Sequence, residues 1–167
     1  VIGAPNEDVS FLSNAGNAHG YNGATGAFLF TLETDLGDVA ASRRMGDAVA
    51  GIADIDGDNV PDIAVGAPDQ QAGTEPGGGR VYLFSGADGS VIDVLTGALQ
   101  EGGEFGSSIA QVGDLVGNAT PDLVIGAPRE DIVDGGTTIS EAGQVYIVDG
   151  ATRSMTSIVP PSFTSGG

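Results

Sequence analysis

The sequence predicts an all-β fold built from repeated antiparallel units, and three observations support this prediction. The phrase VIGAP at residues 1–5 recurs as AVGAP at residues 64–68 and as VIGAP at residues 124–128, which gives a period of about 60 residues. Short runs rich in Val, Ile, Tyr and Phe alternate with Gly, Asp, Asn and Pro, which are strand and turn signals. No window carries an apolar stripe with the 3.6-residue period of a helix. We therefore expect many short strands and little helix.

Two further phrases repeat in register with the first. The segments that begin at Gly16, Gly79 and Gly143 align without gaps, and MGDAVAGIAD from Met45 matches FGSSIAQVGD from Phe105. The order of the phrases is the same in each unit. Each complete unit therefore reads as four strands in a fixed order.

The four strands of the middle unit are expected, in chain order, at GDAVAGIAD, PDIAVGAP, RVYLFS and SVIDVLTG, with an acidic loop between the first two. The last unit repeats this pattern with GSSIAQVGD, PDLVIGAP and QVYIVD. The segment PGGGR at residues 76–80 lacks the Lys-Ser/Thr ending of a phosphate loop. It is expected to bound a strand.

A four-stranded unit that repeats every several tens of residues is typical of a β-propeller blade. The combination FGSSIAQVGD, PDLVIGAP and GQVYIVDG resembles the FG-GAP repeat of the integrin alpha-subunit propeller and its microbial relatives, over nearly the whole chain. The resemblance implies four-stranded antiparallel blades of an integrin-alpha-like β-propeller. It also implies that the acidic loop joins the first two strands of a blade on the lower face.

On this pattern the chain divides into three blades and a tail. Residues 1–38 are a partial blade that lacks its first strand, residues 39–97 a full blade with the acidic loop, and residues 98–159 a full blade with a degenerate loop. Residues 160–167 are a tail that falls where the first strand of a following blade would begin. Closed propellers have at least about four blades, so the propeller is incomplete in this chain. Either a longer parent chain or other copies of this chain supply the rest, and one copy's tail could donate the strand that the next copy's first blade lacks.

The acidic loop, DIDGDNVPD at residues 54–62, predicts a Ca²⁺ site. It places four aspartates within nine residues, where like charges at about 4 Å repel by roughly 1 kcal/mol per pair in water. Hard oxygen ligands at alternating positions of a tight turn suit Ca²⁺, and Gly57 and Asn59 permit the bends. The expected ligands are the carboxylates of Asp54, Asp56, Asp58 and Asp62 and the carbonyl of Val60.

Other interpretations of the loop are weaker. An EF-hand would place Glu at position twelve between two helices, whereas that position is Val65 in an expected strand. Mg²⁺ prefers a smaller octahedral shell with retained waters, and a solvated turn without an ion is the remaining alternative. The resemblance implies Ca²⁺, because the FG-GAP hairpin loop of the form Asp-x-Asp-x-Asp-Gly-x-x-Asp binds it; Asn59 stands in place of that glycine.

The equivalent loop of the last unit, DLVGNATPD at residues 114–122, predicts a weaker second Ca²⁺ site. Val116 and Asn118 replace two of the carboxylates, and Ala119 takes the turn position. The segment from Asn118 is also an N-glycosylation sequon. The remaining donors are Asp114, Asn118, the carbonyl of Thr120 and Asp122.

The charge balance and composition exclude several classes of partner. With 23 acidic and five basic residues and a net charge of -18, the chain lacks the basic footprint that nucleic acids and anionic membranes require. No apolar run reaches the length of about 18 residues needed for membrane insertion. The absence of cysteine excludes a thiol enzyme. Divalent cations fit this composition better.

No catalytic constellation is visible. His19, the only histidine, aligns with Tyr82 and Tyr146 and is expected to be a strand residue. The carboxylate pairs Glu130–Asp131 and Glu33–Asp35 are expected in solvated turns. Six aromatic residues at strand positions are expected to pack between blades: Tyr21, Tyr82, Tyr146, Phe28, Phe30 and Phe84.

The sequence thus predicts a non-enzymatic, calcium-stabilised scaffold that is extracellular or at the cell surface and serves protein interaction, adhesion or self-assembly, including a filament built by strand exchange. The resemblance implies that an extracellular protein or glycan ligand would meet loops opposite the calcium loops, at residues 6–15, 69–78 and 129–142. The alternative is the propeller or accessory part of a secreted carbohydrate-active enzyme whose catalytic residues lie outside this chain.

Overall fold

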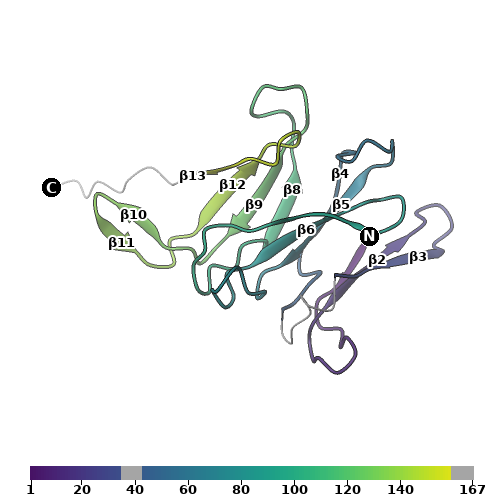
Figure 1. Ribbon diagram of the computed structural model, residues 1–167, viewed down its shortest axis with the longest axis horizontal. Helices are drawn as coiled ribbons and strands as arrows, with labels where there is room; N and C mark the ends of the chain where they lie inside the picture. Colours follow the sequence, from purple (N-terminus) through teal and green to yellow (C-terminus); the bar gives the residue numbers. More distant parts are fainter. Residues whose placement is uncertain (35–42, 159–167) are drawn as a thin grey trace.

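The computed structural model describes residues 1–34 and 43–158, and within these ranges the chain forms strands and no helix. The strands build three antiparallel sheets and one small hairpin (Figure 1). The predicted all-β fold class and the four-stranded antiparallel units are therefore confirmed. The sheets do not close into a ring, which agrees with a propeller that is incomplete in this chain.

The first sheet has three strands, in the order β1 (Ile2–Ala4), β2 (Asn17–Tyr21) and β3 (Phe28–Leu32). The turn between β2 and β3 begins at Asn22, whose side-chain carbonyl accepts hydrogen bonds from the backbone N–H groups of Ala24 and Thr25 at 2.9 and 3.0 Å. Such a turn starts readily at Asn, because its short side chain satisfies the backbone locally.

The second and third sheets are four-stranded meanders with the same strand order. The second contains β4 (Val49–Ile52), β5 (Asp62–Ala67), β6 (Arg80–Phe84) and β7 (Val91–Leu95). The third contains β8 (Ser108–Gln111), β9 (Leu123–Ala127), β12 (Gln144–Val148) and β13 (Met155–Ile158). All four strands expected in the second sheet are present, and PGGGR ends where β6 begins.

A small hairpin, β10 (Ile132–Asp134) and β11 (Thr137–Ile139), interrupts the connection between β9 and β12. It projects from the third sheet (Figure 1). The sequence pattern predicts only a variable loop over this stretch. Its turn residues, Gly135 and Gly136, have φ of +56° and +87°, and two such residues between short strands are a known hairpin signal.

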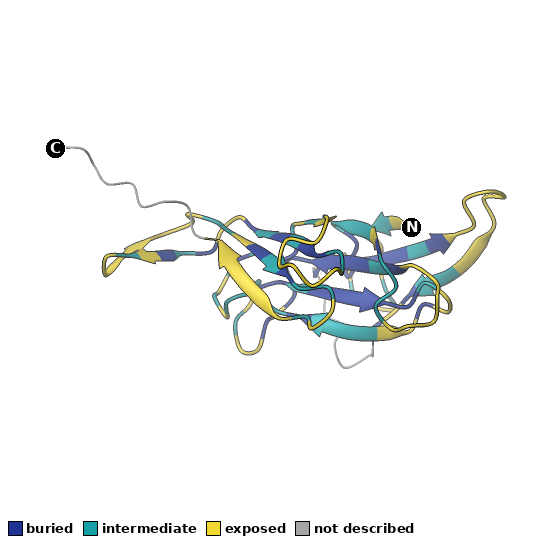
Figure 2. Ribbon diagram, turned by 90° about the horizontal axis from the view of Figure 1, so that it is seen from above, coloured by how far each residue is buried: buried dark blue, intermediate teal, exposed yellow. Residues whose placement is uncertain are grey.

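The core lies between the sheets. One cluster packs the first sheet against the second and contains Leu32, Met45, Val65 and Phe84. A larger cluster packs the second sheet against the third. Figure 2 shows buried strands in the middle of the stack and exposed strands at its ends. Apolar burial of this kind stabilises by roughly 25 cal/mol per Å², so each sheet depends on its neighbour.

Pairs of glycines set the distance between neighbouring sheets. A Cβ added at Gly3 would lie 2.0 Å from the carbonyl oxygen of Gly46, and one added at Gly66 would lie 2.1 Å from the carbonyl oxygen of Gly106. Such distances are far inside van der Waals contact, so only glycine permits this approach. The glycine of the repeated Gly-Ala-Pro phrase therefore permits close backbone contact between sheets.

The expectation that six aromatic residues pack between blades is correct for part of the set. Tyr82 and Phe84 are buried, and Phe30 packs against their cluster; Tyr146 is also buried. Tyr21 and Phe28, by contrast, are 38% and 56% exposed and contact each other edge to face, with ring centroids 5.8 Å apart. They lie where the β2–β3 hairpin turns, beyond the bulge at Gly20/Tyr21, outside the part of the first sheet that forms the core.

The prediction that Glu130 lies in a solvated turn is wrong. Its side chain is fully buried, and the Tyr146 hydroxyl donates a hydrogen bond to its Oε2. The same hydroxyl accepts a hydrogen bond from the backbone N–H of Ala98 at 2.9 Å. The Gly143 N–H donates to the Glu130 carbonyl at 2.9 Å, so the loop returns over Glu130 and encloses it. Glu33 is exposed as expected, whereas Asp35 lies outside the described residues.

Candidate metal site

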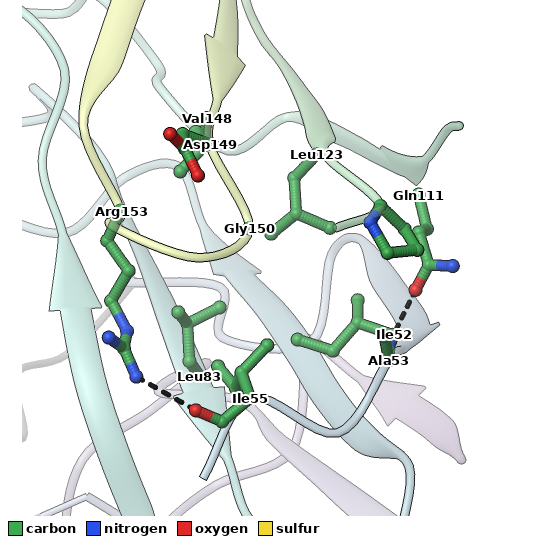
Figure 3. Close-up of a pocket in the computed structure, with 11 residues that line it drawn as sticks. Ile52, Ala53, Ile55, Leu83, Gln111, Leu123, Val148, Asp149, Gly150 and Arg153 are labelled. Carbon is green, nitrogen blue, oxygen red and sulfur yellow. Dashed lines mark hydrogen bonds between the residues drawn. The ribbon is translucent and has the colours of Figure 1, made fainter. Parts of the chain in front are cut away.

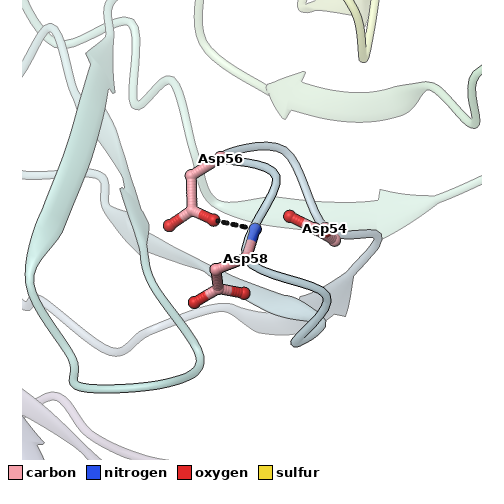
Figure 4. A group of neighbouring side chains, drawn as sticks. All are labelled: Asp54, Asp56 and Asp58. Atoms are coloured by element: carbon pink, nitrogen blue, oxygen red, sulfur yellow. Dashed lines mark hydrogen bonds between the residues drawn. The ribbon is translucent and has the colours of Figure 1, made fainter.

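Three carboxylates gather in the loop between β4 and β5. The side chains of Asp54, Asp56 and Asp58 each offer an oxygen, and these oxygens all lie within 4.8 Å of one another (Figure 4). Asp54 is partly buried, and the other two are exposed. Within residues 1–34 and 43–158 this is the one group of three or more acidic or metal-binding side chains with such spacing.

Backbone hydrogen bonds fix the shape of this loop. The Asp54 carboxylate accepts hydrogen bonds from the N–H groups of Gly57 at 2.6 Å and Asn59 at 2.8 Å. Gly57 and Asn59 have φ of +89° and +69°, a region that Gly and Asn enter at low cost. The Asp56 carboxylate accepts a hydrogen bond from the Asp58 N–H at 3.1 Å. The sequence therefore specifies the turn before any ion is considered.

The electrostatics of the loop differ between its first two carboxylates. Hydrogen bonds from the N–H groups of Gly57 and then Asn59 lower the pKa of Asp54. Partial desolvation raises the pKa of Asp56, and the negative charges of neighbouring aspartates raise it further. The Asp56 anion is thus disfavoured by its neighbours, and a cation at the centre of the group would reverse this effect.

The donor set fits Ca²⁺. Calcium binds oxygen ligands at about 2.3–2.6 Å, so two oxygens on opposite sides of one ion lie at most about 5.2 Å apart. The 4.8 Å limit on the separations in this group is compatible with a single ion. Asp54, Asp56 and Asp58 would hold it, and the ion would neutralise their mutual repulsion.

The other two predicted ligands are placed differently. Asp62 is buried, and its carboxylate accepts hydrogen bonds from the N–H of Ile55 at 2.7 Å and the N–H of Gly86 at 3.0 Å. It therefore ties the loop to the turn between β6 and β7. The Val60 N–H donates to the Asp58 carboxylate at 2.7 Å. Metal binding by Asp62 and by the Val60 carbonyl stays a prediction.

The equivalent loop between β8 and β9 has the same backbone shape with fewer carboxylates. The Asp114 carboxylate accepts hydrogen bonds from the N–H groups of Gly117 at 2.6 Å and Ala119 at 2.7 Å, and these bonds lower its pKa, that from Ala119 most strongly. The Asn118 side chain accepts a hydrogen bond from the Thr120 N–H at 2.9 Å and donates one to Asp149 at 2.8 Å. Asp114 and Asn118, whose oxygens are predicted ligands of the weaker second site, are thus already engaged in hydrogen bonds.

Asp122 repeats the structural role of Asp62. It is fully buried and accepts hydrogen bonds from the N–H of Leu115 at 2.6 Å and the N–H of Gly150 at 3.1 Å. The sequence pattern predicts both aspartates as ion ligands, which stays a prediction, and it does not by itself predict this hydrogen-bonding role. A signal was present, because the aspartate at position nine persists in the second loop although two other carboxylates are lost there.

A side chain from the third sheet reaches the first acidic loop. Arg153 donates a hydrogen bond to the carbonyl of Ile55 at 3.2 Å (Figure 3). It also lies 3.3 Å from the Asp93 carboxylate. The enclosed space beside it has a volume of about 10 Å³, which is room for about one water molecule. The Arg153 contact therefore joins the second and third sheets, and the space beside it is too small for a substrate.

His19 lies in β2, as predicted for a strand residue. Its two ring nitrogens lie 3.1 Å from the Thr31 hydroxyl and 2.8 Å from a carboxylate oxygen of Glu7. Both contacts lie within the first sheet and the loop beside it. Separately, the described part of the chain contains no helix long and apolar enough to cross a bilayer.

Comparisons with known proteins support the resemblance seen in the sequence. The family model described as the FG-GAP repeat matches residues 45–84. The chain is 34% identical to integrin alpha-5 of Xenopus laevis over 119 residues, which are 67% of this chain and 11% of that protein. It is 31% identical to integrin alpha-4 of Xenopus laevis over 131 residues, which are 75% of this chain and 11% of that protein. A third match, integrin alpha-6 of Gallus gallus, is 34% identical over 96 residues, 55% of this chain and 8% of that protein. The chain thus spans about a tenth of these relatives.

Proposed function

Because residues 45–84 are an FG-GAP repeat and most of the chain resembles integrin alpha subunits, we propose that the chain is part of a calcium-stabilised adhesion or interaction scaffold. Its blades correspond to residues 1–38, 39–97 and 98–159. Residues 35–42 and the tail at 160–167 lie outside the described residues. The proposal places the scaffold outside the cell or at its surface, where millimolar calcium suits the affinity of about 10⁻⁴ to 10⁻³ M typical of extracellular modules.

The observation that carries this proposal is the oxygen cluster of Asp54, Asp56 and Asp58 in the loop of a recognised FG-GAP repeat. Its role is structural, because the loop closes the β4–β5 hairpin and the nearby Arg153 contact connects it to the next sheet. A bound ion would stabilise the hairpin and, through it, the contact between sheets. No residue of this cluster is assigned to catalysis.

We propose that partners bind at the loops opposite the calcium loops. The loops at residues 6–15 and 69–78 share one backbone pattern, with bridges at Val9–Leu12 and Ala72–Glu75, but carry different side chains; the loop at 129–142 departs from them and contains the β10–β11 hairpin. Variation on a repeated frame is typical of binding surfaces. Further blades of the same parent chain or other copies of the chain complete the propeller. The carbohydrate-active enzyme alternative rests on residues beyond this chain, and no contact described here favours it.

Calcium titration with two matched variants tests the metal site. The variant Asp56→Asn with Asp58→Asn removes two charges but keeps side-chain oxygens that can accept the hydrogen bonds from Asp58 and Val60. At calcium about a hundredfold above Kd, the wild type is expected to gain about 2.7 kcal/mol, which raises Tm by roughly 5–11 °C for a domain of this size. The double variant should lose most of that gain.

The second loop supplies the control. Replacing Val116 and Asn118 with Asp restores the carboxylate pattern on a loop that already has the required backbone hydrogen bonds. We expect this variant to bind one additional Ca²⁺ by isothermal titration calorimetry. A calcium-dependent Tm shift that survives unchanged in the Asp56/Asp58 variant would contradict the proposed site.

A further inference from the structure

Two junctions between sheets share one arrangement. The dipeptides Met45–Gly46 and Phe105–Gly106 come shortly before β4 and β8, respectively, and each lies in a slot of the preceding sheet. Met45 and Phe105 are both completely buried there. In the third sheet the corresponding slot is an open groove.

At the first junction, the Met45 N–H donates a hydrogen bond to the carbonyl of Ala15 at 3.2 Å. The Gly46 carbonyl oxygen lies 2.0 Å from where a Cβ on Gly3 would stand, and a Cβ on Gly16 would lie 2.3 Å from the Met45 carbonyl oxygen. The slot therefore consists of Gly3 and Gly16, which lack the side chains that would exclude the Met45–Gly46 backbone, and of the Ala15 carbonyl, which accepts a hydrogen bond.

The second junction repeats each contact. The Phe105 N–H donates to the carbonyl of Gly78 at 3.1 Å. The Gly106 carbonyl oxygen lies 2.1 Å from a Cβ built on Gly66, and a Cβ on Gly79 would lie 2.1 Å from the Phe105 carbonyl oxygen. The Phe105 ring packs edge to face on Tyr146, with centroids 5.2 Å apart.

The third sheet has the same slot without an occupant from the described residues. Among the described residues, a Cβ on Gly126 would meet only the Ser108 side chain within 4 Å, and the three atoms nearest to a Cβ on Gly143 all belong to Pro128, at 3.0–3.4 Å. Val145 is 40% exposed, whereas its equivalent in the second sheet, Val81, is completely buried.

The groove over these positions has a volume of about 640 Å³, within the range of about 300–1,000 Å³ typical of ligand clefts. Its lining includes Ser108, Gly126, Pro128, Ala142, Gly143 and Val145. Ala142 is exposed, whereas its equivalents in the other two slots, Ala15 and Gly78, are buried.

We propose that this groove binds the segment Ser162–Phe163–Thr164 of the same chain, with Phe163 in the place that Phe105 takes in the second sheet. In both occupied slots the occupant is the next segment of the same chain, and Phe163 is the aromatic residue that follows β13. This inference deepens the proposed function, because it makes the tail the start of a following blade.

The connection is long enough. Ile158 pairs with Val145 as Leu95 pairs with Val81, so the two residues are equivalent. The five residues from Ile158 to Phe163 span up to about 17 Å. Gly97, only two residues after Leu95, already lies against the Phe105 ring, since a Cβ there would be 2.6 Å from it. The distance to be covered is therefore short.

The match departs from the repeat at one position. Gly46 and Gly106 have φ of +91° and +92°, whereas the corresponding residue of the tail is Thr164. A β-branched residue enters this region only with strain. We therefore expect the tail to dock more weakly than Phe105, and Thr164→Gly to strengthen its docking.

A tryptophan probe tests the proposal. The chain contains no tryptophan, so Phe163→Trp introduces a single tryptophan, which is excited selectively over the three tyrosines. Phe11→Trp at a fully exposed side chain is the reference. We expect a blue-shifted emission and a several-fold lower acrylamide quenching constant at position 163, with further protection after Thr164→Gly. Gly126→Val, which fills the groove, should remove the protection. Far-UV circular dichroism and a cooperative urea transition show whether that variant folds.

Three results would overturn the proposal: quenching at position 163 equal to that at position 11, protection that disappears on dilution, or protection that persists in folded Gly126→Val. Loss on dilution would mean that another copy supplies the segment. The measurement needs neither calcium nor a partner, so failure of docking is distinguishable from failure of the calcium titration.

Discussion

The close approach of Gly66 to Gly106 predicts an unusually large cost for adding a single methyl group. A Cβ at Gly66 would lie 2.1 Å from the Gly106 carbonyl oxygen, whereas ordinary C···O contacts begin at about 3.3 Å. The second and third sheets would therefore have to separate locally by about 1.2 Å. The backbone fixes the position of the Cβ, and the carbonyl oxygen belongs to the backbone, so no side-chain rotation can relieve the contact.

The expected cost follows from this geometry. Overpacking a buried contact costs about 1–3 kcal/mol, and a clash between two backbones belongs at the upper end. Replacing Gly by Ala also restricts the unfolded chain, which returns about 0.4–1 kcal/mol. We expect Gly66→Ala to lower the free energy of unfolding by about 2 kcal/mol net, which lowers Tm by roughly 4–8 °C.

The repeat supplies a matched control. Gly126 occupies the equivalent position in the third sheet, where an added Cβ would meet only the rotatable Ser108 hydroxyl. The tail segment proposed to dock in that groove can leave it at a small cost in free energy. Gly106, by contrast, leads into β8, which is paired with β9 and cannot leave the third sheet. Urea unfolding of Gly66→Ala and Gly126→Ala, followed by far-UV circular dichroism, should give a difference of about 2 kcal/mol. Equal losses in the two variants would refute the reasoning.

Two further predictions concern the second loop and the buried carboxyl group. Ala119 has a φ of +69°, the same value as the equivalent Asn59. The left-handed region costs a non-glycine residue roughly 1–2 kcal/mol, and Asn enters it more readily than Ala. Ala119→Asn should therefore raise the metal-free Tm by a few degrees, and a lowered Tm in calorimetry would contradict this. Burial raises the pKa of Glu130, so the folded state favours the neutral carboxyl group. The contribution of Glu130 to stability is therefore fully present below its unfolded pKa of about 4.3. It is lost as the pH rises through the folded pKa. Glu130→Gln keeps a neutral partner for Tyr146 and should flatten the fall of Tm with rising pH in that window; parallel Tm–pH curves for the two proteins would rule out this role.

The strands of the second and third sheets were predictable because their residues meet two requirements at once. Segments such as PDIAVGAP are rich in β-branched residues and end in Gly-Ala-Pro, and they recur at a fixed period. Strand propensity and repetition therefore agree, and β5 and β9 form where expected. The β10–β11 hairpin has no counterpart in the other repeats, so the periodicity that located the other strands gave no information about it.

The candidate site was only partly readable, because carboxylates serve two purposes in these loops. The side chains of Asp54, Asp56 and Asp58 form one cluster, and the carboxylate of Asp62 accepts hydrogen bonds from backbone N–H groups; metal binding by these four residues stays a prediction. Spacing alone does not separate a ligand from a backbone acceptor. The burial of Glu130 was likewise not predictable from its local sequence, because it depends on contact with Tyr146, 16 residues further along the chain.

The two acidic loops also bear on how such a chain can change over time. Because Asp54 and Asp114 hold the same turn by backbone hydrogen bonds, a hairpin of this kind keeps its shape while its ion ligands come and go. With the proposed calcium site, natural variation can therefore add or remove carboxylates one repeat at a time while the turn itself is kept. An array of these repeats is then free to be stiff at one end and ion-responsive at the other.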